Sequence, residues 1–200
     1  MTENYQKQLD NIINALSAPK KLTLHSCCAP CSSYVIEYLS NYFDITVLFY
    51  NPNIDTKEEY NKRAKEQQRL IAEMPLKNKV KFICLDYDAE SYNERIKGLE
   101  KEKEGGARCY ECFDLRLAKT AQIAKEQNSE YFATTLTISP LKNAKIINTI
   151  GNNLSQIYDI AWLPNDFKKL GGYQRSIELS KIYNLYRQNY CGCIHSKKGL

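Results

Sequence analysis

The sequence lacks any long apolar run. None of its stretches approaches the roughly 18 consecutive apolar residues that a membrane-spanning helix needs. The first twenty residues are polar and mixed in charge, without the apolar segment of a signal peptide. We therefore expect a cytoplasmic protein with no membrane partner. Repeats and low-complexity tracts are absent as well, so we expect one domain over residues 1–200, with a leading helix in 1–20 and a core in 21–196.

Glycine is missing from the turn where a nucleotide-binding protein would need it. A phosphate cradle requires backbone N–H groups to approach the ligand closely, and glycines permit that approach. After the first apolar run the chain reads Cys27-Cys28-Ala29-Pro30-Cys31, which contains no glycine. Pro30 also has no N–H group to donate. The sequence therefore argues against ATP-dependent chemistry.

Cysteine, in contrast, is abundant, and seven of the eight cysteines fall into three short groups. The groups are Cys27, Cys28 and Cys31; Cys109 and Cys112; and Cys191 and Cys193. In a reducing compartment such thiols serve as metal ligands or catalytic groups rather than as disulfides. The eighth cysteine, Cys84, lies in an apolar stretch, and we expect it to be buried in the core.

The spacing of the cysteines leaves three kinds of site open. Two thiolates placed like Cys109 and Cys112 hold one metal or two corners of an iron–sulfur cluster. A zinc site completed by Cys191 and Cys193 and a thiol–disulfide redox motif are the alternatives. Seven thiols exceed the four that one tetrahedral metal uses, which favours a cluster with a second metal or with catalytic thiols. Cys31 and Cys109 also lie near predicted helix starts, where the helix dipole favours the thiolate.

Apolar periodicity predicts alternating strands and helices. Strands are expected at 22–25, 45–50, 80–85, 130–136 and 160–163, and helices at 4–17, after Pro30, at 57–73, from after Ser91 to about Glu104, from Cys109, at 142–157 and at 174–187. This alternation indicates an α/β fold, a three-layer parallel sheet with helices on both faces. The first cysteine group then lies at the end of the first strand, at the sheet edge where ligands bind.

Histidine is scarce, and His25 and His195 each lie close to a cysteine group. Either could ligate a metal, although a hydrogen-bonded strand end and a tail residue are the more ordinary roles. Asp86, Asp114 and Tyr110 are further candidate acids or ligands, with helix capping, surface and lid roles as the alternatives.

The charge permits a phosphate-rich partner without requiring one, because the net excess is only +5. Basic residues and tyrosines interleave late in the chain: Lys142, Lys145, Lys168, Lys169, Tyr173, Arg175, Lys181, Tyr183, Tyr186, Arg187, Tyr190, Lys197 and Lys198. This mixture is typical of proteins that bind single-stranded RNA or a tRNA loop. A solvated helix face above packed tyrosines is the ordinary alternative.

Five segments together resemble one known family. They are 25–31, 50–53, 108–117, 134–140 and 186–193, and the match runs from about residue 21 to residue 196. Their joint pattern is similar to that of the cobalamin-independent epoxyqueuosine reductases of the QueH type, whereas the Cys-x-x-Cys motif alone would be a weak sign.

The resemblance implies the last step of queuosine biosynthesis in tRNA. In that step epoxyqueuosine at the wobble position is reduced to queuosine, and the epoxide becomes an alkene with release of water. The resemblance also implies a 4Fe-4S cluster, an adjacent iron ion and an external electron donor. The implied fold is similar to the adenine-nucleotide α-hydrolase-like (HUP) group, with a cysteine turn replacing the phosphate loop.

We predict that Cys109, Cys112, Cys191 and one thiol of the first turn bind the cluster, with the remaining thiols near the second iron. The predicted ligands of the two metal groups together are Cys27, Cys28, Cys31, Cys109, Cys112, Cys191 and Cys193. The candidate catalytic residues are Cys28, Cys31, Tyr110, His25 and Asp86. The alternatives are an iron–sulfur tRNA sulfur-transferase on the same fold, which should need ATP, and a non-catalytic RNA-binding module stapled by zinc.

Overall fold

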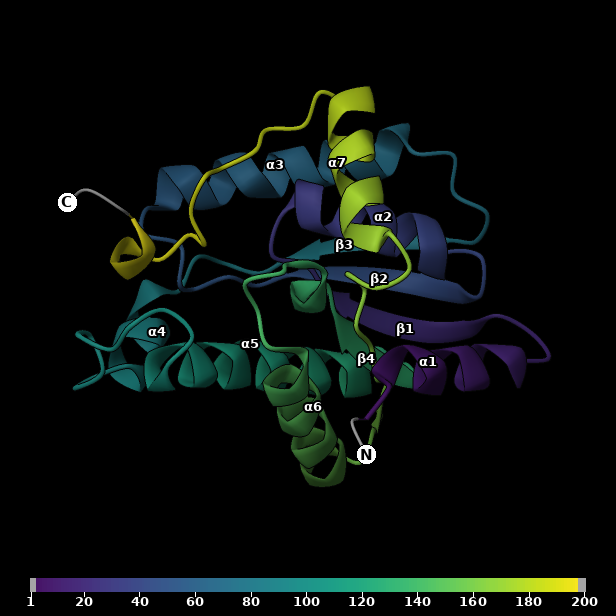
Figure 1. Ribbon diagram of the computed structural model, residues 1–200, viewed down its shortest axis with the longest axis horizontal. Coiled ribbons are helices and arrows are strands. Elements are labelled where there is room, and N and C mark those ends of the chain that lie inside the picture. The colour runs from purple at the N-terminus through teal and green to yellow at the C-terminus, as the bar shows by residue number, and fades with distance from the viewer. Residues whose placement is uncertain (1–2, 198–200) are drawn as a thin grey trace.

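A five-stranded parallel sheet forms the middle layer of the protein (Figure 1). The computed structural model describes residues 3–197, so Lys198 of the basic group above lies outside the described residues. The strands are β1 (Lys20–His25), β2 (Phe43–Phe49), β3 (Val80–Cys84), β4 (Tyr131–Thr134) and β5 (Ala161–Trp162). They are ordered β3-β2-β1-β4-β5. The predicted α/β fold with a parallel sheet is confirmed.

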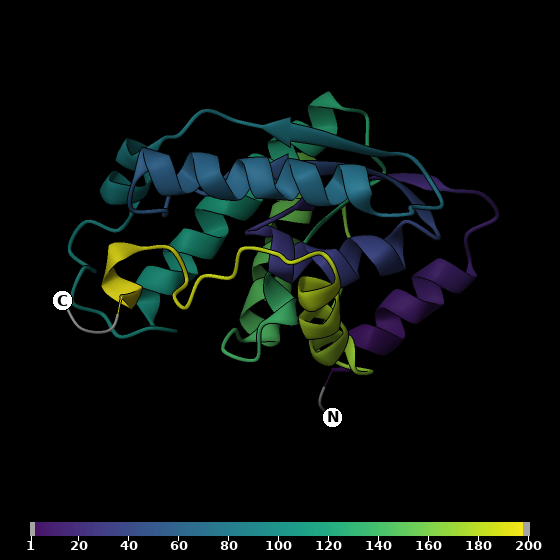
Figure 2. The same cartoon turned by 90° about the horizontal axis from the view of Figure 1, so that it is seen from above.

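Helices cover both faces of this sheet (Figures 1 and 2). One face carries α2 (Ala29–Leu39), α3 (Lys57–Glu73) and α7 (Gly172–Ile182), and the other carries α4 (Ala89–Arg95), α5 (Ala107–Glu126) and α6 (Ala144–Tyr158). The chain also contains α1 (Tyr5–Asn14) and the short 3₁₀ turns η1 (Leu136–Ile138) and η2 (Ile194–Ser196). The predicted three layers are therefore present.

A hydrophobic core fills the space on each side of the sheet. Leu24 of β1, Val35 of α2 and Val47 of β2 belong to the larger core and are fully buried. Leu117 of α5 and Phe132 of β4 belong to the second core, on the opposite face. Strands covered on both faces must be apolar over most of their length, which explains the apolar runs in the sequence.

Local signals fix the starts of two helices that flank the site. Thr56 caps α3, because its hydroxyl oxygen accepts the backbone N–H of Glu59 at 3.1 Å. Asn143 caps α6, because its side-chain oxygen accepts the N–H of Lys145 at 2.9 Å. The predicted bounds of the helix at 57–73 are confirmed.

Three predictions about local structure are wrong. The charged helix expected to reach about Glu104 ends at Arg95, and the chain reverses at Gly98, whose φ is +84°. The last helix ends at Ile182 rather than at 187, because Asn184 adopts a left-handed conformation with φ of +45°. Cys84 is exposed rather than buried, because β3 is an edge strand of the sheet.

The strand order creates a switch point between β1 and β4. Chain connections run outward in opposite directions from these two central strands, and ligands of open α/β sheets bind at such a point, beyond the carboxyl ends of the strands. Within residues 3–197, no helix has both the length and the apolar character needed to cross a membrane.

Candidate metal centre and active site

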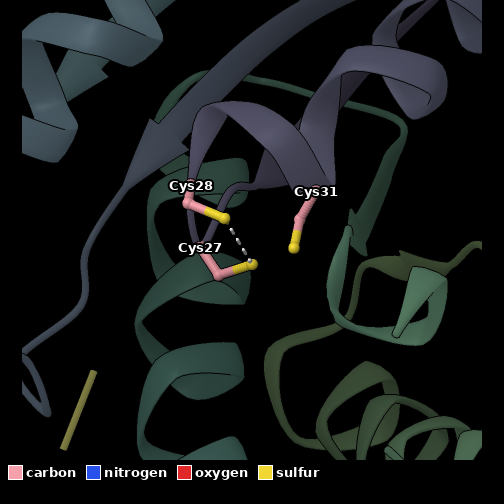
Figure 3. A group of neighbouring side chains, drawn as sticks. All are labelled: Cys27, Cys28 and Cys31. Atoms are coloured by element: carbon pink, nitrogen blue, oxygen red, sulfur yellow. Dashed lines mark hydrogen bonds between the residues drawn. The ribbon is translucent and has the colours of Figure 1, made fainter. Parts of the chain in front are cut away.

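The first cysteine group forms a compact triad at the end of β1 (Figure 3). Cys28 is the N-cap of α2, and Pro30 occupies the first turn of that helix, where its missing N–H costs nothing. The sulfur atoms of Cys27, Cys28 and Cys31 lie within 4.8 Å of one another and turn toward a common point. Three thiols at this separation can bind one metal ion.

The other two groups meet although most of a domain separates them in sequence. Cys109 and Cys112 lie in the first turns of α5, one helical turn apart. The irregular segment after α7 brings Cys191 and Cys193 to the same place, so that all four residues line one cavity of about 70 Å³. Ser196 of η2, which follows Cys193, lines this cavity together with Cys109 at the start of α5.

A larger cavity of about 890 Å³ adjoins the small one. The three thiols of the triad line it together with Cys191. Cys191 and Lys142 line both cavities, which shows that the two cavities share a wall. The structure thus brings all seven grouped cysteines to two adjoining hollows at the switch point of the sheet.

Two cations lie between the thiol groups. Arg116 is 1% exposed, and its Nη1 donates to the sulfur of Cys112 at 3.7 Å, while its Nη2 donates to the side-chain oxygen of Asn51 at 2.6 Å. Burial lowers the pKa of Lys142, but the negative charges that the nearby thiols of Cys191, Cys27 and Cys31 carry when ionised outweigh burial and hold that pKa above its ordinary value. Positive charge at this point favours the thiolate forms that metals bind.

The triad itself favours a single thiolate when no metal is bound. Hydrogen bonds from the thiols of Cys28 and Cys31 hold the pKa of Cys27 well below its ordinary value. The Cys27 thiolate in turn raises the pKa of Cys28 to about 12. A metal ion entering the triad would therefore displace protons from the other two sulfur atoms.

Burial has the largest influence on the pKa values of the second cysteine group, Cys109 and Cys112. It raises the pKa of Cys112 to about 12, and Arg116 only partly offsets this effect. Burial also raises the pKa of Cys109, whose sulfur accepts the backbone N–H of Gly105 at 3.2 Å. Thiols that stay protonated in a closed space become good ligands only when a cation replaces their protons.

His25 lies beneath the triad rather than beside the cavity. It is fully buried, its Nδ1 lies 2.8 Å from the hydroxyl of Thr134, and its Nε2 accepts from Nε of Arg116 at 3.3 Å. Burial, followed by the charge of Arg116, lowers the pKa of His25 to about 3. The ring is therefore neutral, and its visible role is to orient Arg116 at the strand end.

The structure does not bring the other predicted acids to the two cavities. Tyr110 is 39% exposed on α5, and Asp86 is exposed beyond the end of edge strand β3. Asp114 pairs with Arg95, and His195 is exposed in η2. None of these four lines either cavity described above.

Two residues of the site were missed as site residues by sequence reasoning. Arg116 follows Cys112 by one helical turn, so helical spacing is the signal that could have placed it on the thiol-bearing face of α5. Lys142 was noted only as part of a basic group, and no local pattern marks it, because its position depends on the loop between η1 and α6. The fold therefore adds two cations to the seven thiols.

The fold and the thiols define a class of protein: an α/β protein that offers cysteine sulfur, rather than a phosphate loop, at its switch point. The sequence model of one family, "Epoxyqueuosine reductase QueH", matches residues 22–199. The chain belongs to the epoxyqueuosine reductase QueH family, and it is therefore an oxidoreductase.

Curated members of this family resemble the chain over most of their length. Epoxyqueuosine reductase QueH of Streptococcus pyogenes is 45% identical over 198 residues, which cover 98% of this chain and 78% of that protein. The Staphylococcus epidermidis protein of the same name is 44% identical over 98% of this chain and 87% of its own length. The Thermotoga maritima protein is 35% identical over 86% of this chain and 88% of its own length.

Among solved structures, the NMN synthetase from Francisella tularensis aligns with 94% of this chain and 90% of its own. The TM-score is 0.38 and the sequence identity is 12%. Such a similarity is too loose to bear on function.

Proposed function

We propose that the chain reduces epoxyqueuosine to queuosine in tRNA, as the last step of queuosine biosynthesis. Family membership supports this activity. The structural observation that carries it is the convergence of seven thiols from three remote segments on two adjoining cavities. The larger cavity, at about 890 Å³, falls in the size range of small-molecule sites and suits a nucleoside.

We propose a 4Fe-4S cluster with an adjacent iron ion as the cofactor. When bound, these groups would supply single electrons and a Lewis acid for the epoxide oxygen. A buried donor beside the four-cysteine cavity supports the fit, because Arg108 Nε has no hydrogen-bond partner among the described residues. Such orphaned atoms are expected where a polar group normally lies.

The assignment of thiols to the two metal groups follows the sequence-based proposal. Cys109, Cys112 and Cys191 bind the cluster with one thiol of the triad, and the remaining triad thiols lie near the second iron. Cys191 supports this partition because it lines both cavities. Cys193 is the alternative fourth ligand, since it shares the small cavity with Cys109 and Cys112.

The reaction needs two electrons and two protons to convert an epoxide into an alkene and water. The electrons come from an external one-electron donor. Lys142 is the proposed proton donor, because it lines both cavities and its raised pKa keeps it protonated. Arg116 holds the thiolate charge, and neutral His25 fixes Arg116 in place. Cys28 and Cys31 remain the candidate catalytic thiols.

The rim of the larger cavity suits an RNA loop. Leu141 is 81% exposed and Tyr173 is 37% exposed, and both line the cavity with Arg187 and Lys197. Exposed apolar and aromatic groups can stack on splayed bases while cations contact phosphates. Arg175 has a different partner, since its Nη2 lies 2.7 Å from Glu37. We propose tRNA with a queuosine-type wobble nucleoside as partner, in the cytoplasm, where reducing conditions keep thiols free.

The activity is tested with anaerobically reconstituted protein, dithionite as reductant and tRNA that carries the epoxide. We expect the modified nucleoside to lose one oxygen atom by mass spectrometry. Unchanged nucleoside in the presence of a reduced cluster would count against the reductase. Zinc without iron in anaerobically purified protein would instead favour the zinc-stapled RNA-binding module, and sulfur gain with ATP would favour a sulfur-transferase.

Single cysteine variants test the ligand set. We expect Cys109→Ser to lose iron and the cluster's visible absorbance, because one ligand is removed from a closed site. Cys84→Ser is the matched control, since Cys84 is exposed on β3 and lines neither cavity. Iron analysis of both variants decides the matter: an intact cluster in Cys109→Ser would refute its assignment.

A further inference from the structure

The segment that carries Cys191 and Cys193 is held along α3 by a row of polar contacts. Arg69 donates to the carbonyl of Tyr183 at 3.0 Å, and Glu66 accepts the N–H of Tyr186 at 2.7 Å. Nearer the thiols, the N–H of Asp55, just before α3, donates to the carbonyl of Gly192 at 3.0 Å. Both ribbon views show this irregular segment running beside the helix (Figures 1 and 2). The position of two candidate ligands therefore depends on α3.

Arg63, on the same helix, contacts this segment at the glycine between its two thiols. Its side chain is 2% exposed, and its Nε donates to Glu59 at 2.7 Å. Its Nη1 lies 3.0 Å from the place that a Cβ on Gly192 would occupy, and Gly192 separates Cys191 from Cys193. The guanidinium also lies 5.1 Å from the ring centroid of Tyr190. The segment is therefore packed directly on this cation.

One nitrogen of Arg63 has no visible purpose in the folded chain. Nη2 is buried and has no hydrogen-bond partner in the described part of the chain. Burial lowers the pKa of Arg63, but Glu59, and then Cys28 whenever its thiol is ionised, raise it above its ordinary value, so the guanidinium also lies within electrostatic reach of the triad. A buried N–H donor without an acceptor is costly, and it persists where a ligand normally accepts from it.

We infer that Arg63 is a positioning residue of the metal centre and that its Nη2 donates to an anionic sulfur where the two thiol groups meet. This inference rests on the proposed function, because the sulfur becomes anionic and fixed when metal is bound. A donated hydrogen bond and a nearby positive charge stabilise the more negative, reduced state of a sulfur-bound metal centre. Arg63 would thereby raise the reduction potential of the centre.

The test compares Arg63→Met with Arg69→Met in the full chain reconstituted with iron and sulfide. Arg69 is the matched control: it belongs to the same row on α3, pairs with Glu66 and Glu73, and contacts the same segment far from the thiols. The readout is the midpoint potential from an EPR-monitored titration with dithionite. We expect Arg63→Met to disfavour reduction at least tenfold, about 59 mV for one electron, and Arg69→Met to match the wild type.

Arg63→Lys keeps the charge but replaces the planar fork with a single ammonium, which is unable to hold Glu59 and reach a sulfur together. We expect a smaller shift in the same direction, and this variant decides the matter if Arg63→Met does not fold. Potentials equal to the wild type in the folded variants would overturn this inference alone. A wild-type protein that forms no cluster would overturn the proposed function, and the role of Arg63 with it.

A second readout avoids the iron centre. Cobalt(II) added to the metal-free protein reports thiolate binding through its visible absorbance, and competition with a chelator gives its affinity. We expect Arg63→Met to bind cobalt at least tenfold more weakly than Arg69→Met, in the range found when partners of metal ligands are removed. Equal affinities would contradict a positioning role.

Discussion

Gly192 lies between Cys191 and Cys193, and its conformation determines how these two thiols reach the site. Its φ is +120°, a conformation that residues with a side chain rarely adopt. A Cβ there would lie 3.0 Å from Nη1 of Arg63 and 3.3 Å from Cγ1 of Ile54. Glycine therefore allows the chain to turn between Cys191 and Cys193 while it packs directly on α3.

Replacement of this glycine should affect both stability and metal retention. We expect Gly192→Ala to lower the free energy of unfolding by about 1 to 3 kcal/mol, because alanine is strained at this φ. Gly98→Ala is the control, since Gly98 has φ of +84° but a Cβ added there would meet nothing within 4 Å. Urea denaturation and iron analysis distinguish them: both variants lose stability, and only Gly192→Ala loses iron. Full iron retention in Gly192→Ala would contradict this view.

At this scale the sequence reveals the thiols better than the charges around them. Clustered cysteines stand out because they are rare, whereas Arg116 and Lys142 are two cations among 28 and become special only because the fold buries Arg116 and places Lys142 beside both cavities. The prediction that Cys84 is buried is wrong because it, too, depends on the tertiary fold. Its apolar neighbours indicate a strand, but they do not show that the strand lies at the edge of the sheet.

At the scale of elements, α5 presents Cys109, Cys112 and Arg116 along one face. It is held in place by α6, which packs closely on β5 because Gly151 offers no side chain there. A Cβ on Gly151 would lie 2.2 Å from Cδ2 of Trp162, whose indole N–H donates to Asn148 at 3.0 Å. The packing of α6, which lies against α5, thus depends on the absence of a side chain at Gly151.

This contact predicts opposite effects for two alanine substitutions in α6. Gly151→Ala should destabilise the fold by about 1 to 3 kcal/mol, because overpacking outweighs the gain in helix propensity. Thr149→Ala, at an exposed position of the same helix, should be neutral or slightly stabilising. Denaturant unfolding of both variants checks this, and a stabilised Gly151→Ala would show that α6 and β5 separate easily.

Element starts are more predictable than element ends. Thr56 and Pro30 announce their helices by local chemistry that a sequence displays. α4 and α7 end close to residues with a left-handed backbone, Gly98 and Asn184. The charged residues that follow each of them would also be compatible with a continued helix. Propensity alone therefore extends both helices too far.

At the scale of the whole molecule, His25 couples stability to pH. Its pKa is about 3 in the folded chain and 6.5 in an ordinary environment. Between these values the unfolded chain binds a proton that the folded chain does not, so stability is lost as the pH falls through 6.5 toward 3. The slope approaches about 1.4 kcal/mol per pH unit.

Denaturant midpoints of the metal-free protein test this coupling. We expect the midpoint to fall between about pH 7 and about pH 5, and His25→Gln to show a flatter dependence over that window. The variant is the reference for every other titrating group in the chain. Identical pH slopes in the two proteins would mean that the buried ring accepts a proton without cost.

The convergence of the thiols is the part that sequence patterns foresee least. Alternating strands and helices predict a parallel sheet, but they do not show that β1 and β4 are neighbours. They also give no sign that the irregular segment after α7 crosses to the start of α5. The grouping of seven thiols at three places suggested that they converge on one site, and the family resemblance then implied which metal groups they bind.

The wall shared by Cys27 and Cys191 has a consequence for biogenesis. Most of the 200 residues separate these two cysteines, so a ribosome adds Cys191 long after Cys27. Under the proposed ligand assignment, the cluster lacks one of its sulfur ligands until residue 191 has emerged from the ribosome. The proposed centre would therefore be completed only after this late segment is made, and a chain that ends before it would expose its remaining thiols to oxidation.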